Sequence, residues 1–276
     1  MPEIAPRVAA RANRVPPVQS RGLPAALSPQ AFRAMPSTFL GEFFGTLILL
    51  LLGNGVVANV LLTDTKGNNG GLIVITAGWA FAVMSGGMVA SALGAPGELN
   101  PAVSIANIVV GAYPLATGLA HIAAQMLGAM AGAALVWLHY LPHWARTHDA
   151  ELIRACHCNS PAVRSTVPNL VAEIIGTAVL VIVAGAIGAQ GVLGATPATN
   201  MGGFLVGCLV WGIGLSLGGP TGYAINPARD LGPRIMHALL PIANKGGSDW
   251  GYSWIPVLGP IIGATAATLL WRSLIA

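Results

Sequence analysis

Charged residues are scarce in this 276-residue chain, since Asp, Glu, Lys and Arg together make up only 8% of it. Ordinary soluble domains contain about 25% charged residues. Hydrophobic residues account for 54% of the chain, so too few charges are present to solvate the surface of a soluble protein of this length. This composition disfavours a soluble enzyme and indicates a single membrane domain with several crossings. The basic residues do not gather on one face, so we predict no nucleic-acid partner.

Cysteine is also scarce, with Cys156, Cys158 and Cys208 as its three occurrences. An odd number, with two of them one residue apart, is a poor disulfide framework. The Cys156-His157-Cys158 cluster offers soft ligands but lacks a fourth one, so we interpret it as loop thiols and a loop imidazole and predict no metal and no cofactor. The 36 glycines do not recur at every third position, which excludes collagen. Frequent glycine is typical of packed transmembrane helices.

Long apolar stretches are abundant. Each is close to the ~20 residues that cross ~30 Å of hydrocarbon as a helix. Lipid forces such a segment to be helical, because its backbone polar groups must pair internally. We therefore predict an all-α membrane protein with six transmembrane helices at 38–62, 72–94, 115–140, 169–188, 203–218 and 252–274.

Residues 1–36 are rich in Pro and Arg and have no long apolar run, so we expect a disordered tail. Six crossings place both termini on one side of the membrane. The five arginines of the tail predict that this side is the cytoplasm of a multi-pass protein in the cell membrane. The 141–168 loop also carries three arginines and argues the other way, but the first segment usually dominates orientation.

The chain contains an internal repeat. A Glu-Phe-Phe-Gly-Thr sequence begins at Glu42, and a Glu-Ile-Ile-Gly-Thr sequence begins at Glu173. Each is followed by an Asn-Pro-Ala motif, which begins at Asn100 in the first case and at Asn226 in the second. Because each half has an odd number of crossings, the second half enters the membrane from the opposite face. The domain at 37–276 is thus predicted to hold repeat one at 37–140, a loop at 141–168 and repeat two at 169–276.

Each Asn-Pro-Ala motif opens an apolar stretch too short to span a bilayer. Residues 101–110 would form ~15 Å of helix, about half the hydrocarbon thickness. Asn is a preferred N-cap and Pro is preferred at the first helical position. We therefore predict two re-entrant half-helices in an inverted repeat, with Asn100 and Asn226 meeting at the midplane of the membrane. Non-helical backbone at that depth is tolerated only within protein or along a water-filled cavity, which indicates a pore.

The predicted junction is electropositive, because each helix N-terminus carries roughly half a positive charge. Two such ends repel cations, including hydronium. A passing water or alcohol oxygen would accept hydrogen bonds from both asparagine amides and could not then relay a proton. Such a pore conducts a neutral solute and still holds a proton gradient.

The sequence from Gly219 to Arg234 reads Gly-Pro-Thr-Gly-Tyr-Ala-Ile-Asn-Pro-Ala-Arg-Asp-Leu-Gly-Pro-Arg. Together with the repeat, it resembles the aquaporin family, and most closely its glycerol facilitator (aquaglyceroporin) branch. The resemblance covers about 38–274. It implies a passive channel for glycerol and other small uncharged solutes, with some water, and a homotetramer in which each subunit holds its own pore.

The resemblance also implies roles for individual residues. It places Arg229 at the outer constriction, where the matching position of repeat one is Val103. It further implies that Glu42 and Glu173 brace loop backbone. One residue of register is left open at Trp79, with Ala80 as its competitor. The implied selectivity filter consists of Trp79, Gly214, Tyr223 and Arg229. The implied solute-accepting backbone carbonyls are those of Gly97, Glu98, Thr221, Gly222, Tyr223 and Ala224.

Glu98 departs from the family pattern, which usually has His at that position. A carboxylate near the cytoplasmic mouth would act on charged solutes or on gating, or it would only bond local amides; we favour the second interpretation. Three other functions stay open. They are a water-dominant pore, a channel for other small neutral solutes such as protonated short organic acids, dihydroxyacetone or urea, and an ion-coupled transporter.

An enzyme is the last alternative, since residues 214–218 match the Gly-x-Ser-x-Gly pattern of serine hydrolases. That pattern needs a strand-turn-helix context, whereas Ser216 ends a predicted membrane helix. We therefore predict no catalytic residues.

Overall fold

The computed structural model describes residues 37–189 and 201–275, and within these ranges the chain is helical with no strand. The predicted tail at 1–36 lies outside the described residues. The helices are α2 (Ser37–Leu61), α3 (Leu72–Ala92), α4 (Pro101–Val109), α5 (Leu115–His139), α6 (Leu141–Trp144), α7 (Ala150–Ala155), α8 (Thr166–Gly188), α9 (Met201–Leu217), α10 (Pro227–Leu239) and α11 (Ile255–Ile275).

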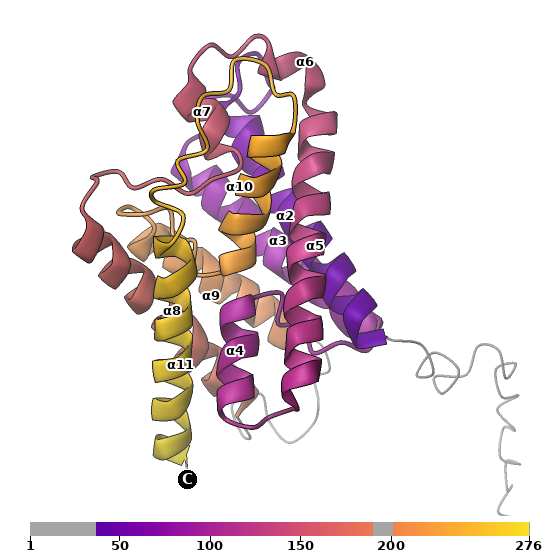
Figure 1. The fold of residues 1–276 in the computed structure, drawn as a ribbon, viewed down its shortest axis with the longest axis vertical. Helices are drawn as coiled ribbons and strands as arrows, with labels where there is room; N and C mark the ends of the chain where they lie inside the picture. Colours follow the sequence, from indigo (N-terminus) through magenta and orange to yellow (C-terminus); the bar gives the residue numbers. More distant parts are fainter. Residues whose placement is uncertain (1–36, 190–200, 276) are drawn as a thin grey trace, which may run out of the picture. The chain divides into compact units, whose positions relative to one another are not determined.

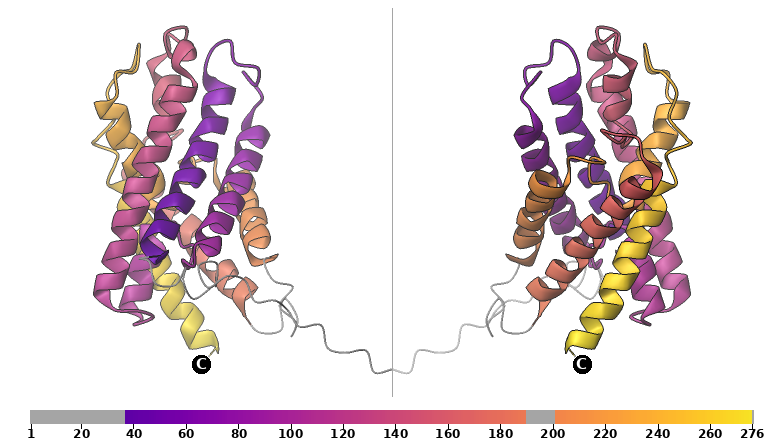
Figure 2. Two further views of the ribbon diagram at one scale, coloured as in Figure 1. Left: turned by 90° about the vertical axis from the view of Figure 1, so that its right-hand side faces the viewer. Right: turned by 90° about the vertical axis from the view of Figure 1, so that its left-hand side faces the viewer.

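The long helices match the predicted crossings to within a few residues. Five of them, α2, α3, α5, α8 and α11, are long and apolar enough to cross a membrane. The sixth predicted crossing corresponds to α9, whose 17 described residues begin at the edge of the undescribed segment. Figure 2 shows the long helices running roughly along one direction, with loops at both ends. The predicted all-α membrane fold is confirmed.

Both half-helices begin as predicted at an Asn-Pro pair. The Asn100 side chain accepts a hydrogen bond from the backbone N–H of Ala102, and Asn226 accepts from those of Ala228 and Arg229. Both asparagines have extended backbone, and proline occupies the first helical turn of each half-helix. Each cap satisfies N–H groups that have no partner inside the helix. In Figure 1, α10 lies above α4, and their N-terminal ends face one another between α5 and α11.

The helix contacts show a two-fold relation between the repeats. If α2 is exchanged with α8, α3 with α9, α4 with α10 and α5 with α11, each pair of helices in major contact corresponds to another such pair or to itself. The α2–α5 and α2–α3 pairs correspond to α8–α11 and α8–α9, while α3 packs on its own counterpart α9. The half-helices are exchanged between repeats, since α4 packs on α11 and α10 packs on α5. This interlocking holds the two N-termini together at the centre.

Glycines let the paired long helices approach closely. A Cβ atom on Gly128 of α5 would collide with the backbone of α2 at Phe43, and one on Gly263 of α11 would collide with the backbone of α8 at Ile174. These are equivalent crossings in the two repeats, and small residues at such positions are typical of membrane helix packing. Gly203 differs, because nothing lies within 4 Å of a Cβ added there.

The 141–168 segment, predicted as a loop, contains the short helices α6 and α7. Asp149 caps α7, because its carboxylate accepts hydrogen bonds from the N–H groups of Glu151 and Leu152. The first of these bonds is 2.8 Å long. The next long helix also begins three residues earlier than predicted, at Thr166.

Candidate functional site

Two buried carboxylates hold the loops that lead into the half-helices. Glu42 of α2 accepts hydrogen bonds from the N–H groups of Glu98 and Leu99, at 2.9 and 2.8 Å. Glu173 of α8 accepts from the N–H groups of Ala224 and Ile225, at 3.0 and 2.8 Å. The loops need such support, because Leu99 and Ile225 have φ angles of 50° and 45°, which a side chain rarely adopts.

This arrangement also decides in which direction the preceding carbonyls point. In a trans peptide the C=O points opposite to the N–H of the next residue. The two N–H groups that face Glu42 therefore turn the carbonyls of Gly97 and Glu98 away from it, and Glu173 likewise turns away those of Tyr223 and Ala224. These four residues all line one cavity of about 570 Å³.

Thr221 and Gly222 are placed differently from the other predicted carbonyl residues. They are not among the residues that line this cavity. Their carbonyl oxygens instead accept hydrogen bonds from the side-chain amide of Asn159, at 3.1 and 2.8 Å.

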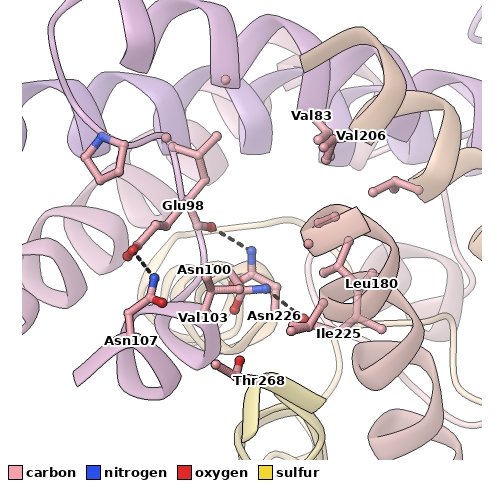
Figure 3. A pocket seen from close by; sticks show the side chains of 18 of the residues that line it. Val83, Glu98, Asn100, Val103, Asn107, Leu180, Val206, Ile225, Asn226 and Thr268 are labelled. Carbon is pink, nitrogen blue, oxygen red and sulfur yellow. Dashed lines mark hydrogen bonds between the residues drawn. The ribbon is translucent and has the colours of Figure 1, made fainter. Parts of the chain in front are cut away.

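The two motif asparagines meet at the centre of the same cavity (Figure 3). The Asn100 amide donates to the carbonyl of Ile225 at 2.8 Å, and the Asn226 amide donates to that of Leu99 at 2.7 Å. Each amide has two N–H donors and one oxygen. The oxygen caps its own half-helix and one N–H binds the opposite loop, so the second N–H of each asparagine makes no hydrogen bond within the part of the chain that the structure describes.

The opposite wall of the cavity is apolar. Figure 3 shows Val83, Val206 and Leu180 across the opening from Glu98 and Asn107. A solute in this lumen thus meets hydrogen-bonding groups along one side and hydrocarbon along the other. The apolar lining includes Leu49, Val83, Val103, Leu180, Val206 and Val210. Gly203 also lines the cavity.

An aromatic pair and an arginine lie at one end of the cavity. Trp79, Tyr223 and Arg229 all line it, whereas Ala80 does not. The Arg229 guanidinium carbon lies 4.2 Å from the ring centroid of Trp79, within cation–π range. Arg229 is only 9% exposed. Trp79 is accommodated by Gly53, where a Cβ would overlap its ring.

Gly214 does not line the cavity itself. A Cβ on Gly214 would lie 2.8 Å from both Cζ of Tyr223 and Cγ2 of Thr76. The absence of a side chain at Gly214 therefore makes room for the Tyr223 ring, and it widens the lumen only by letting that ring withdraw.

The Glu98 carboxylate bonds local groups. It accepts hydrogen bonds from Ser104 Oγ at 2.5 Å, Asn107 Nδ2 at 2.6 Å and the Tyr113 hydroxyl at 3.0 Å. His121 Nδ1 lies 3.7 Å away. These contacts tie the loop before Asn100 to α4 and α5. Sequence reasoning did not single out Asn107, Tyr113 or His121, because the repeat has no matching signal at those positions.

A buried ion pair follows Arg229 on α10. Arg234 donates to both carboxylate oxygens of Asp230 at 2.8 Å, and both side chains are fully buried. The same guanidinium donates to the carbonyls of Asn159 and Ser248, at 2.8 and 2.6 Å. Asp230 and Arg234 therefore hold the segments around Asn159 and Ser248, and neither of them lines the cavity. No motif or spacing in the sequence pointed to Asn159.

The Cys156-His157-Cys158 cluster is buried in the packed end of the fold, with at most 1% of any member exposed. The His157 ring lies between those of Trp144 and His237, at centroid distances of 5.6 and 5.8 Å. Burial lowers the pKa of His157 to about 3 and raises that of Cys158 to about 12, so the imidazole and the thiol are neutral. In the described ranges, no three His, Cys, Asp or Glu side chains are grouped to hold a metal ion.

Ser216 lies within α9 and is exposed. A serine hydrolase places this residue at a sharp strand-to-helix turn. The Gly-x-Ser-x-Gly match at 214–218 instead lies at the end of a helix, with Gly218 directly after its last residue.

Together, the inverted pair of half-helices and the cavity at their junction define a membrane channel of the aquaporin type. The chain matches the Major intrinsic protein family over residues 31–271. It therefore belongs to this family.

Individual relatives agree with this assignment. The chain is 52% identical over 237 residues to the glycerol uptake facilitator protein of Streptococcus pneumoniae (strain ATCC BAA-255 / R6), which covers 86% of this chain and 99% of that protein. It is also 52% identical over 237 residues to a probable glycerol uptake facilitator protein of Thermotoga maritima, covering 86% and 98%. The X-ray structure of the aquaglyceroporin from Plasmodium falciparum is similar with a TM-score of 0.76 at 28% identity, covering 87% of this chain and 97% of that one.

Proposed function

We propose that this protein is a passive channel for glycerol and other small uncharged solutes, with some water, that excludes protons and ions. The observation that carries this proposal is the two-sided lumen, in which backbone carbonyls and asparagine amides lie across from an apolar wall. A polyol has the complementary pattern, since its hydroxyls lie along one edge and its carbons along the other. The similarity to glycerol uptake facilitator proteins supports the same solute.

Each part of a passing glycerol has a partner in this lumen. Its hydroxyl oxygens accept hydrogen bonds from the free N–H groups of Asn100 and Asn226 and from the Arg229 guanidinium. Its hydroxyl hydrogens are donated to the carbonyls of Gly97, Glu98, Tyr223 and Ala224. Its carbons contact Trp79, the Tyr223 ring and the valine-rich wall. Partners on both sides replace the hydration shell, which lowers the barrier to entry.

The lumen does not replace the hydration shell of an ion in this way. Two opposed helix N-termini contribute roughly half a positive charge each, and Arg229 adds a full charge at one end. Cations are repelled along this stretch, while anions meet a lumen whose remaining wall is hydrocarbon. The two asparagine amides orient a central water as an acceptor, which breaks a proton-conducting file.

Glycerol flux in proteoliposomes tests this function. An inward glycerol gradient should give stopped-flow re-swelling well above that of empty vesicles. Val206→Trp, which fills the lumen, should abolish the excess. Phe204→Trp is the matched control, since Phe204 lies on the same helix and is 43% exposed on the outside. Re-swelling at the rate of empty vesicles, with folded protein present, would contradict the proposal.

Water-dominant conduction is the main alternative, and the same vesicles separate it by comparing osmotic water flux with glycerol flux. Other small neutral solutes form a second group. A panel of dihydroxyacetone, urea and short organic acids at low pH would rank them against glycerol. The proposed role as a passive channel predicts that the flux of glycerol, dihydroxyacetone or urea is not driven uphill by a proton gradient, and that no residue acts as a catalyst.

We further propose the cell membrane as the location, with both termini in the cytoplasm and four subunits each holding its own pore. The arginine-rich tail supports this orientation. The family assignment supports a multi-pass membrane location. A membrane-impermeant maleimide applied to intact cells should label Val163→Cys but label Ala10→Cys only after permeabilisation. The reverse pattern would overturn the orientation.

A further inference from the structure

Asn159 lies in the segment between α7 and α8 and makes four hydrogen bonds near the second half-helix. Its side-chain amide donates to the carbonyls of Thr221 and Gly222, at 3.1 and 2.8 Å. Its backbone N–H donates to Asp230 at 2.7 Å, and its carbonyl accepts from Arg234 at 2.8 Å. Since Asp230 and Arg234 are both on α10, Asn159 is fixed relative to the helix that carries Arg229.

The orientation of the Asn159 amide is determined by these contacts. Turning the amide over would place its oxygen against two carbonyl oxygens. In the present orientation Oδ1 is buried and has no hydrogen-bond partner in the part of the chain that the structure describes. A buried acceptor without a partner lowers stability. The two hydrogen bonds that the Asn159 amide donates are therefore kept at the cost of leaving its own oxygen without a partner.

Gly222 is adapted to the same contact. Its φ angle is +74°, and a Cβ there would lie 2.9 Å from the Asn159 amide nitrogen. Glycine is thus needed both for the backbone conformation and for the approach of the amide.

The residue held by this contact is Tyr223. Its φ angle of 39° lies in the left-handed region, which is unfavourable for a tyrosine. Asn159 binds the two carbonyls before it, and Glu173 binds the two N–H groups after it. The ring position and the lumen-facing carbonyl of Tyr223 both depend on this strained backbone.

We propose that Asn159 is a positioning residue for solute selectivity, which acts through Tyr223 without contacting the solute. This inference rests on the proposed conduction of glycerol. Without the amide, the Thr221–Gly222 segment is free to relax and Tyr223 leaves its fixed place. Glycerol loses more than water does, because it needs several contacts at once, while water needs few.

The test compares Asn159→Ala and Asn159→Asp with wild type in the same proteoliposomes. Asn159→Asp keeps the shape but replaces the donors with a carboxylate. The control is Asn244→Ala, because the Asn244 amide also binds two carbonyls of the outer segment, those of Ala145 and Thr147, away from the filter. We expect the ratio of glycerol to water permeability to fall by about threefold or more in both Asn159 variants and to stay at the wild-type value in Asn244→Ala.

A wild-type ratio in folded Asn159 variants would overturn the inference, and so would an equal fall in Asn244→Ala, which would indicate general loosening of the segment. If neither variant folds, Asn159→Ser retains one hydroxyl donor. An intermediate ratio would then support the inference, and an unchanged one would overturn it. Absence of glycerol flux in the wild type would contradict the proposed function instead.

Discussion

The peptide groups just before each half-helix are oriented by one hydrogen bond to a buried glutamate. The N–H of one residue binds a buried glutamate, and the carbonyl of the preceding residue, which lines the cavity, points away from that glutamate. The repeat in the sequence was sufficient to pair Glu42 with Glu173. It was not sufficient to separate the carbonyls that face the lumen from those of Thr221 and Gly222, because Asn159 is 62 residues away from Thr221 in the chain. A contact across that distance leaves no local pattern.

Gly214→Ala tests the proposed role of Gly214 and Tyr223 in the selectivity filter. The added methyl would press on the Tyr223 ring and move it toward the lumen, so we expect glycerol permeability to fall by about tenfold and water permeability to fall less. Stopped-flow measurement of both fluxes checks this. Gly212→Ala is the control on the same helix, since nothing lies within 4 Å of a Cβ there. Equal losses of glycerol and water in Gly214→Ala would contradict this account of the filter.

The buried imidazole of His157 makes stability depend on pH. Burial holds its pKa at about 3, below the ordinary value of 6.5, so the unfolded chain binds a proton that the folded chain does not. The stability that comes from burying the neutral His157 imidazole is therefore fully present above pH 6.5 and is lost progressively as the pH falls toward 3. Thermal unfolding in detergent should show a decline on acidification that is shallower in His157→Phe than in wild type. The same substitution at the exposed His148 should leave the wild-type slope.

At the scale of helices, hydrophobic length and the Asn-Pro caps were sufficient to predict the long helices and both half-helices. Lipid leaves few alternatives for such segments. The short helices α6 and α7 were missed, because the 141–168 segment is neither long nor uniformly apolar and its cap at Asp149 is a weak signal. The register at Trp79 also needed tertiary structure, since only packing against Gly53 and Arg229 distinguishes it from Ala80.

Gly128→Ala tests the close crossing of α5 on α2. The added methyl would meet the backbone at Phe43, which cannot move as a flexible side chain can. We expect a loss of about 1–3 kcal/mol in the free energy of unfolding, the usual cost of overpacking. Gly55→Ala on α2 is the control, because its Cβ would meet nothing within 4 Å. Denaturation followed by circular dichroism gives both values, and equal stability of the two variants would refute the close crossing.

At the scale of the whole channel, the two-fold arrangement is imperfect, and the differences lie at its two ends. One end has Arg229 where the repeat has Val103, and the other has the Glu98 network. The repeat in the sequence predicted the symmetric centre, with its paired asparagines. The residues after the two motifs also showed that Arg229 has no charged counterpart. The partners of Glu98 could not be predicted, because Asn107, Tyr113 and His121 lie outside the repeated motifs.

The most direct test of this account measures glycerol and proton fluxes in the same proteoliposomes, with a trapped pH-sensitive dye and stopped-flow light scattering. If opposed half-helices and their asparagines form the centre of a pore for uncharged molecules, glycerol permeability will rise with the amount of protein, while proton flux will stay at the level of empty vesicles. A proton flux that rises in parallel with the glycerol flux, or glycerol permeability equal to that of the lipid alone, would contradict the account.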